Sequence, residues 1–178
     1  MSQDDEELDE LRQERLEQLK EQQQGEGASE AREQQRQQAE ARAGRKTPYE
    51  DVSALDRLSI PLGVVSSNQQ STVDFLLEHF GLDSYFGVAL GRQPTLESLA
   101  RKKPAPHYLC RAADALDAES VLFVGDNDSD IEAAANAGVD SAFIRRPHRR
   151  DHQPSPTPTH TVDDLHDVVA LCRSSTTA

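Results

Sequence analysis

Three groups of polar residues in this chain have side chains suited to binding a phosphoryl group and a metal ion. They are Ser66 with Ser67 and Asn68, then Lys103, and finally Asp126 with Asp130. A phosphoryl group spreads negative charge over its oxygens, so its site needs hydroxyl and amide donors together with a fixed cation. Ser66 and the N–H groups after it can donate, and Lys103 can supply the cation. The sequence therefore indicates phosphate chemistry.

Asp126 and Asp130 are candidate ligands of Mg²⁺, a hard cation that takes oxygen ligands and keeps several waters. Their four-residue spacing puts both carboxylates on one side of the turn that enters a helix. Each group alone is an ordinary feature, since serines after a strand are good helix caps and a lysine before proline is commonly solvated. The order of all three groups along the chain is what favours one common site.

The elements that must position these residues begin near residue 60, where short apolar runs alternate with helical patterns. Continuous runs are typical of strands buried on both faces of a parallel sheet. They lie at 62–65, 86–90, 121–124 and 142–144, and the helical spacing covers 73–80, 109–116, 131–138 and 165–172. We therefore expect an α/β doubly wound fold, with ligands beyond the carboxyl ends of its strands. Gly81 and Gly138 should end helices, and residues 147–161 should form a Pro/Thr-rich surface loop.

The three groups together resemble motifs of the haloacid dehalogenase superfamily, especially its phosphoglycolate-phosphatase-like branch. GVVSSN is similar to the second motif, KKPAPHYL to the third and FVGDNDSDIEAAANAG to the fourth, and the resemblance covers residues 46–173. It implies a phosphatase-type hydrolase that acts on a small phosphorylated metabolite with Mg²⁺. It also implies that Ser66 binds the transferring phosphoryl group, that Lys103 steadies its charge, that Asp126 ligates Mg²⁺ and that Asp130 orients the metal shell. Ser67, Asn68 and Asn127 are further candidates in the same site.

The first motif of that family is not found in this sequence. It is an apolar strand ending in Asp-x-Asp, whose first aspartate is the nucleophile. The early acids of this chain follow no apolar run, and Asp126-Asn127-Asp128 already belongs to the fourth motif. The resemblance thus implies an incomplete parallel sheet and impaired or absent phosphoryl transfer.

The missing strand is expected to lie between the strands at 62–65 and 121–124, so its absence opens a gap of roughly 10 Å in the sheet. It would also leave two rows of backbone groups without partners. We predict either that these two strands pair directly, which would bring Ser66 about 5 Å closer to Asp126, or that the domain is marginally stable and prone to aggregate.

Residues 1–45 form a charged segment that differs from the rest of the chain. They contain no Val, Ile, Thr, Phe, Tyr or Trp, so we expect one or two weak helices or disorder. Their Glu/Gln/Arg-rich sequence is similar to the N-terminus of the archaeal DNA-binding family related to programmed cell death protein 5. That resemblance leaves open a DNA-binding function, and it raises the hypothesis that two genes were joined.

Bulk composition narrows the possible partners. The net charge of −13 argues against general affinity for nucleic acid, which requires a basic surface. The alternative is a basic patch of Arg145, Arg146, Arg149 and Arg150, which we otherwise expect to be a solvated loop. Acidity with only four lysines fits a salt-adapted organism. No apolar run approaches membrane-spanning length, and two isolated cysteines indicate a cytoplasmic protein without a disulfide framework.

Three functions remain open from the sequence. The chain could be a Mg²⁺-dependent phosphatase, a binder of phospholigands without catalysis, or a DNA-binding protein. The histidines stand in loops or on helix surfaces without ligand spacing, so the sequence assigns no chemistry to them. The sequence leaves the oligomeric state open.

Overall fold

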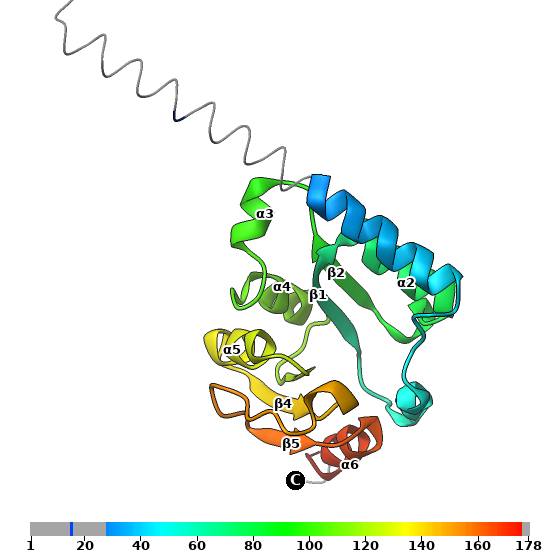
Figure 1. The fold of residues 1–178 in the computed structure, drawn as a ribbon. Coiled ribbons are helices and arrows are strands. Elements are labelled where there is room, and N and C mark those ends of the chain that lie inside the picture. Colours follow the sequence, from blue (N-terminus) through cyan, green and yellow to red (C-terminus); the bar gives the residue numbers. More distant parts are fainter. Residues whose placement is uncertain (1–14, 16–27, 176–178) are drawn as a thin grey trace, which may run out of the picture.

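The computed structural model describes residue 15 and residues 28–175 of the chain. Figure 1 shows strands flanked by helices on both sides. A helix at 28–42 is followed by η1 Glu50–Arg57, β1 Gly63–Gln69, α2 Gln70–Phe80, η2 Asp83–Tyr85, β2 Val88–Arg92, α3 Leu96–Ala100, α4 His107–Ala115, β3 Leu122–Gly125, α5 Asp128–Ala137, β4 Asp140–Ile144, η3 Pro147–Arg149, β5 His160–Val162 and α6 Leu165–Ser175. Within this described part, no helix is both long and apolar enough to cross a bilayer.

The strands form two separate parallel sheets. β1 pairs with β2, and β3, β4 and β5 pair in that order. The register joins Val65 to Leu90 in the first sheet and Val124 to Ala142 in the second. All pairs are parallel, so the strands of each sheet end at the same edge, where ligands bind in open α/β sheets.

Helices cover both faces of β3, which explains why its sequence is a continuous apolar run. Phe123 packs with Leu109 of α4 and Ala134 of α5 on one face. Leu122 and Val124 pack on the other face, against a cluster that includes Val168 of α6. This alternation follows from the period of two in a strand, and burial on both faces is typical of parallel sheets.

The predicted α/β class and its four strands are confirmed, with boundaries that differ by a few residues. Gly81 and Gly138 end α2 and α5 in the left-handed conformation, at φ of 65° and 71°, as their positions predicted. The loop predicted at 147–161 is wrong at its end, because His160–Val162 forms β5 against β4. This strand has only three residues, and a strand can be predicted from hydrophobic pattern only over a longer run. The Pro-rich stretch before it also favours a loop.

Direct pairing of β1 with β3, the first of our two predicted outcomes, is wrong. The two strands belong to different sheets, and no strand of the described residues lies between them. Side chains of α4 and of the segment 58–62 line the space between the two strands. Leu109 of α4 packs near both Val65 and Phe123, so this helix ties the two sheets together without closing the gap. The second outcome, marginal stability, stays a prediction.

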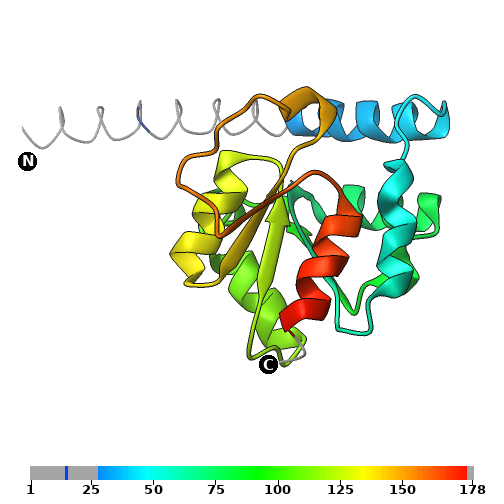
Figure 2. The ribbon, with the colours of Figure 1, turned by 90° about the horizontal axis from the view of Figure 1, so that it is seen from below.

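The helix at 28–42 packs on the domain through polar contacts, with Ala41 buried. Gln34 donates to Ser71 over 2.7 Å, and Arg42 lies 4.8 Å from the ring centre of Phe75 in α2. Figure 2 shows this helix along one side of the domain, with α6 beside η1 further round. The predicted helix in the charged segment is therefore present in its second half, and it lies against the domain. Its first half falls outside the described residues.

Candidate active site

Lys103 lies at the carboxyl ends of both sheets and contacts each of them. Its Nζ is 2.5 Å from Oδ1 of Asp130 at the start of α5 and donates to the Val65 carbonyl of β1 over 3.3 Å. It also lies 5.6 Å from the centre of the Phe123 ring in β3. Side-chain exposure is 15% for Lys103 and 7% for Asp130, so this ion pair is screened little by solvent. The predicted cation is thus held where the second and fourth motifs meet.

Ser66, Ser67 and Asn68 lie in the last part of β1, beyond its regular pairing with β2. The register of the two strands shifts between Val65 and Gln69, so this stretch is irregular. The Asn68 N–H donates to Oγ of Ser66 over 3.1 Å, a local bond that fixes the hydroxyl at the strand end. All three side chains are half-buried, which leaves them accessible to a ligand at this edge.

Asn68 has a second partner that the sequence did not reveal. Its side-chain N–H donates to Oε1 of Gln37, in the helix at 28–42, over 3.2 Å, and Gln37 donates back to Oδ1 of Asn68 over 3.5 Å. Lys46 donates to the same Gln37 over 3.2 Å. Nearby, Glu30 pairs with Arg92 at 2.5 Å and accepts from Gln69 over 3.1 Å. The charged segment therefore reaches the rim of the candidate phosphate site.

Asp126 and Asp130 follow β3 as predicted, but they face different partners. Oδ2 of Asp130 accepts from the Asn127 N–H over 3.1 Å, closing a capping box at the start of α5. Gly125 permits this arrangement, because a Cβ there would overlap the Asp130 carboxylate. Asp126 is about one-third exposed, and its Oδ2 lies 3.1 Å from Nε2 of His148. The structure thus pairs Asp130 with the lysine, while Asp126 contacts His148 and stays partly exposed.

The donor set at this edge fits Mg²⁺ only as a sparsely liganded ion. Among the described residues there is no group of three or more His, Cys, Asp or Glu side chains close enough to hold a metal. Asp126 offers the accessible carboxylate, and Asp130 is already bound to Lys103. Mg²⁺ commonly binds through one or two carboxylates and keeps its remaining waters, so Asp126 suits it as a first ligand.

The loop after β4 folds back over the fourth motif. Arg149 donates to Oδ1 of Asn127 over 2.6 Å, and His152 lies 2.8 Å from Oδ1 of Asp128. The contact with His152 is the main cause that lowers the pKa of Asp128 below its ordinary value, and the bond from the Ser155 N–H is the second. Sequence reasoning missed these contacts, since it assigned the histidines no chemistry. The chain between β4 and β5 turns back toward the start of α5, and this turn brings Arg149 and His152 to Asn127 and Asp128.

The solvated loop predicted for the four arginines is wrong for Arg146. Its side chain is 12% exposed, pairs with Asp51 at 2.7 Å and lies 4.0 Å from the ring centre of Tyr49. Asp51 also accepts from the N–H of Leu165 over 2.8 Å, so η1, the loop after β4 and α6 meet there. Burial alone would raise the pKa of Asp51, but the bonds from Arg146 and Leu165 outweigh it and hold that pKa below its usual value. This arginine is a structural cation.

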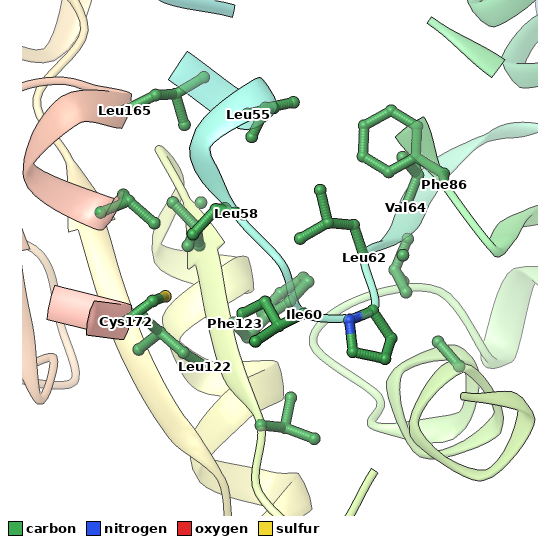
Figure 3. A pocket seen from close by; sticks show the side chains of 18 of the residues that line it. Leu55, Leu58, Ile60, Leu62, Val64, Phe86, Leu122, Phe123, Leu165 and Cys172 are labelled. Carbon is green, nitrogen blue, oxygen red and sulfur yellow. The ribbon is translucent and has the colours of Figure 1, made fainter. Parts of the chain in front are cut away.

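An apolar cavity runs from this edge into the space between the two sheets, and we call it the interstrand slot. Its volume is about 540 Å³. β1 lines it from Gly63 to Val65, and β3 with its flanks lines it from Val121 to Asp126. η1, the segment 58–62, α4 and α6 supply most of the remaining lining residues, and Figure 3 shows Leu58, Ile60 and Leu62 between the strands. The slot opens beside Asp126 and Arg146, within the candidate site.

Comparison with known proteins decides the family. The sequence profile of the haloacid dehalogenase-like hydrolases matches residues 2–144 of this chain. The chain belongs to this family. Pyrophosphatase PpaX of Bacillus cereus (strain B4264) is 36% identical over 101 residues, which make up 56% of this chain and 45% of that protein. The chain thus spans about half the length of that curated relative, and its predicted domain boundary at residue 46 stays a prediction.

Solved structures of the family have the same fold. A predicted phosphoglycolate phosphatase from Haemophilus somnus 129pt superposes with a TM-score of 0.56 at 26% identity, covering 70% of this chain and 56% of that one. A HAD-superfamily hydrolase of subfamily IA from Geobacter sulfurreducens gives a TM-score of 0.55 at 26% identity, covering 68% and 58%. The resemblance to this superfamily and its phosphoglycolate-phosphatase-like members is therefore confirmed. The resemblance of residues 1–45 to an archaeal DNA-binding family stays a prediction.

Proposed function

We propose that this chain binds a small phosphorylated metabolite and Mg²⁺ at the carboxyl ends of β1 and β3, with phosphatase chemistry as its family activity. The observation that carries the proposal is the position of Lys103. Its ammonium contacts the Val65 carbonyl, one residue before Ser66, and the Asp130 carboxylate at the start of α5. A fixed cation between hydroxyl donors and a carboxylate suits a dianionic phosphoryl group and its counter-ion.

Each side chain has a distinct part in that proposal. The Ser66 hydroxyl and the N–H groups of the irregular strand end donate to phosphoryl oxygens, and Lys103 balances their charge. Asp130 holds Lys103 in place and orients the metal shell, while Asp126 ligates the ion. Ser67, Asn68 and Asn127 complete the polar surface. Mg²⁺, when bound, would neutralise charge that develops on the phosphoryl oxygens.

We further propose that turnover by the isolated chain is impaired or absent. A covalent mechanism needs a carboxylate that faces the phosphorus from the strand between β1 and β3. Within residues 28–175 that position is the interstrand slot, whose lining is largely apolar and holds no carboxylate other than Asp126 at its end. Because the walls of the slot supply no carboxylate that could take up the phosphoryl group there, binding without catalysis is the second candidate function.

Ligand-induced thermal shifts test the binding proposal, because a ligand that binds only the folded state must raise its stability. We expect inorganic phosphate and Mg²⁺ each to raise the Tm of the full chain. Ser66→Ala should abolish the phosphate shift and Asp126→Asn the Mg²⁺ shift. Asp114→Asn, an exposed acid on α4, is the matched control and should change neither. If neither ligand shifts the Tm of the unmodified chain, the proposed site is wrong.

Turnover separates the two candidate functions. With p-nitrophenyl phosphate and Mg²⁺, we expect no release of p-nitrophenol above the rate of an Asp126→Asn variant. A rate that disappears in that variant would instead establish an active phosphatase. The binding site would then stand, and the impairment would be refuted.

A further inference from the structure

A histidine of the loop after β4 lies against the carboxylate that the proposed site offers to a metal ion. Nε2 of His148 is 3.1 Å from Oδ2 of Asp126. The side chain of His148 is 56% exposed and that of Asp126 is 32% exposed, so both groups are accessible from solvent. Imidazole nitrogen and carboxylate oxygen are both common metal-binding atoms in proteins. The pair therefore offers two different donor atoms at one point of the site.

Two arginines of the same loop hold His148 in this position. Arg146 pairs with Asp51 at 2.7 Å, and its side chain is only 12% exposed, so the chain is anchored two residues before His148. Arg149 donates to Oδ1 of Asn127 over 2.6 Å, so the chain is anchored again one residue after it. A ligand that is held in place beforehand loses less conformational entropy when the ion binds. The fold thus presents the imidazole to the site as part of a preformed arrangement.

The separation of the two donor atoms matches the span between neighbouring ligands of one small dication. Nitrogen and oxygen ligands lie about 2.0–2.2 Å from Zn²⁺, so neighbouring ligands of a tetrahedral or octahedral ion are about 2.8–3.6 Å apart. The observed 3.1 Å between Nε2 of His148 and Oδ2 of Asp126 lies within this range. A dication can therefore replace the direct contact between the two side chains without rearrangement of the loop.

The second histidine–aspartate pair of the loop is already saturated. Oδ1 of Asp128 accepts from the Ser155 N–H over 3.0 Å, and both oxygens of this carboxylate lie within 3.0 Å of Nε2 of His152. Asp126, in contrast, has His148 as the one side-chain partner of its carboxylate among the residues that the structure describes. This difference assigns the metal to the pair of His148 and Asp126.

The donor atoms decide which ion the pair prefers. Mg²⁺ takes oxygen ligands, whereas imidazole suits first-row transition ions such as Fe²⁺, Co²⁺ and Zn²⁺. His148 therefore adds affinity for a transition ion and little for Mg²⁺. No third His, Cys, Asp or Glu of the described residues joins the pair, so water and phosphoryl oxygens are left to complete the coordination.

We propose that His148 is a metal ligand beside Asp126, and that this pair gives the site a preference for a first-row transition dication over Mg²⁺. The inference rests on the proposed function, because it uses the same carboxylate and names a further class of ion for it. Mg²⁺ still binds through Asp126, without a contribution from the imidazole. Arg146 and Arg149 act as positioning residues for His148.

Calorimetric titration of the full chain with Co²⁺ and with Mg²⁺ tests the preference. We expect Co²⁺ to bind the unmodified chain about tenfold or more tightly than Mg²⁺. His148→Ala should weaken Co²⁺ binding about tenfold or more and change Mg²⁺ binding by less than about threefold. His166→Ala, at an exposed histidine of α6, is the matched control and should keep both affinities.

The outcomes separate this inference from the proposed function. If Mg²⁺ binds but His148→Ala leaves the affinity for Co²⁺ unchanged, or weakens the binding of both ions equally, the inference is overturned and the proposed Mg²⁺ site stands. If neither ion binds the unmodified chain, the proposed function fails together with the inference.

Proton NMR of the Co²⁺-loaded chain shows whether the imidazole binds the ion directly. A histidine ring bound to this paramagnetic ion has ring-proton resonances shifted far outside the ordinary range. We expect such resonances in the unmodified chain and in His166→Ala, and their loss in His148→Ala. Their absence from the unmodified chain at saturating Co²⁺, or their persistence in His148→Ala, would overturn the assignment of His148 as the ligand.

Discussion

Removing the charge of Lys103 should destabilise the whole domain, because its partner is buried. Lys103→Met keeps an unbranched side chain that can pack on Phe123, but it has no cation. The carboxylate of Asp130, 7% exposed, would then remain with only the capping bond from the Asn127 N–H. An ionised group buried without its partner is strongly destabilising. The substitution therefore isolates the contribution of the ion pair.

The size of the effect follows from the distance between the charges. At 2.5 Å and an effective dielectric constant of about 20, the attraction is about 7 kcal/mol before solvation is counted. Desolvation of the two groups offsets much of this, and removing one partner from such a pair lowers stability by about 3–5 kcal/mol. We expect a loss of that size in the free energy of unfolding. Since whole domains have about 5–15 kcal/mol, the variant would be close to unfolding.

Urea unfolding followed by circular dichroism at pH 7 measures this loss. The double variant Lys103→Met/Asp130→Asn removes both charges while Asn retains an acceptor for the cap, so it should recover most of the stability. Lys102→Met, at the exposed neighbouring lysine, should stay within about 0.5 kcal/mol of the unmodified protein. If the losses of the two single variants simply add in the double variant, the two groups do not interact and the reasoning fails.

Three further predictions concern contacts around the site. Gly125→Ala should lower the free energy of unfolding by about 1–3 kcal/mol, measured by urea unfolding, because its methyl group displaces the Asp130 carboxylate. Glu30→Gln should lower stability by about 3 kcal/mol and speed proteolysis of the helix at 28–42, because the side chain of Arg92 is only 6% exposed; unchanged cleavage would refute this. Asp51→Asn should destabilise the protein at pH 7 but match it more closely as the pH falls below about 4, since the stability from a carboxyl whose pKa is lowered on folding is full above its unfolded pKa and is lost as the pH falls through its lower folded pKa. A gap that stays constant from pH 7 to pH 3 in thermal melts would contradict that assignment.

The fourth motif was predictable because its signals are local. An apolar run followed by Gly-Asp and a second acid four residues on specifies a buried strand, a turn and a helix start, and the structure has all three. Lys103 was placed correctly for a different reason: the order of the motifs along the chain fixed the edge of the sheet to which it must belong. The bond from Lys103 to the Val65 carbonyl could not be predicted from the sequence. It forms at the edge of β1 that has no neighbouring strand, and the sequence does not show which edge that is.

The contacts that escaped prediction join residues far apart in the chain through polar groups. Gln37 meets Asn68 across 31 positions, and glutamine has no apolar period that would reveal a packing face. Arg146 meets Asp51 across 95 positions, and its neighbours at 145, 149 and 150 made it look like part of a basic surface patch. The failure of β1 and β3 to pair has the same origin. Side chains of α4 and of the segment 58–62 line the space between the two strands, and no local pattern in the sequence reveals that packing.

The central claim is that this domain keeps a phosphate site around Lys103 while no carboxylate of its described residues attacks phosphorus from the interstrand slot. Reductive trapping tests it most directly. The full chain is incubated with acetyl phosphate and Mg²⁺, quenched, reduced with borohydride and digested for mass spectrometry, so that any acyl phosphate on an aspartate becomes homoserine. We predict that no aspartate is converted, although phosphate raises the Tm of the same preparation. Homoserine at any one aspartate, lost when Lys103 is replaced, would contradict the account.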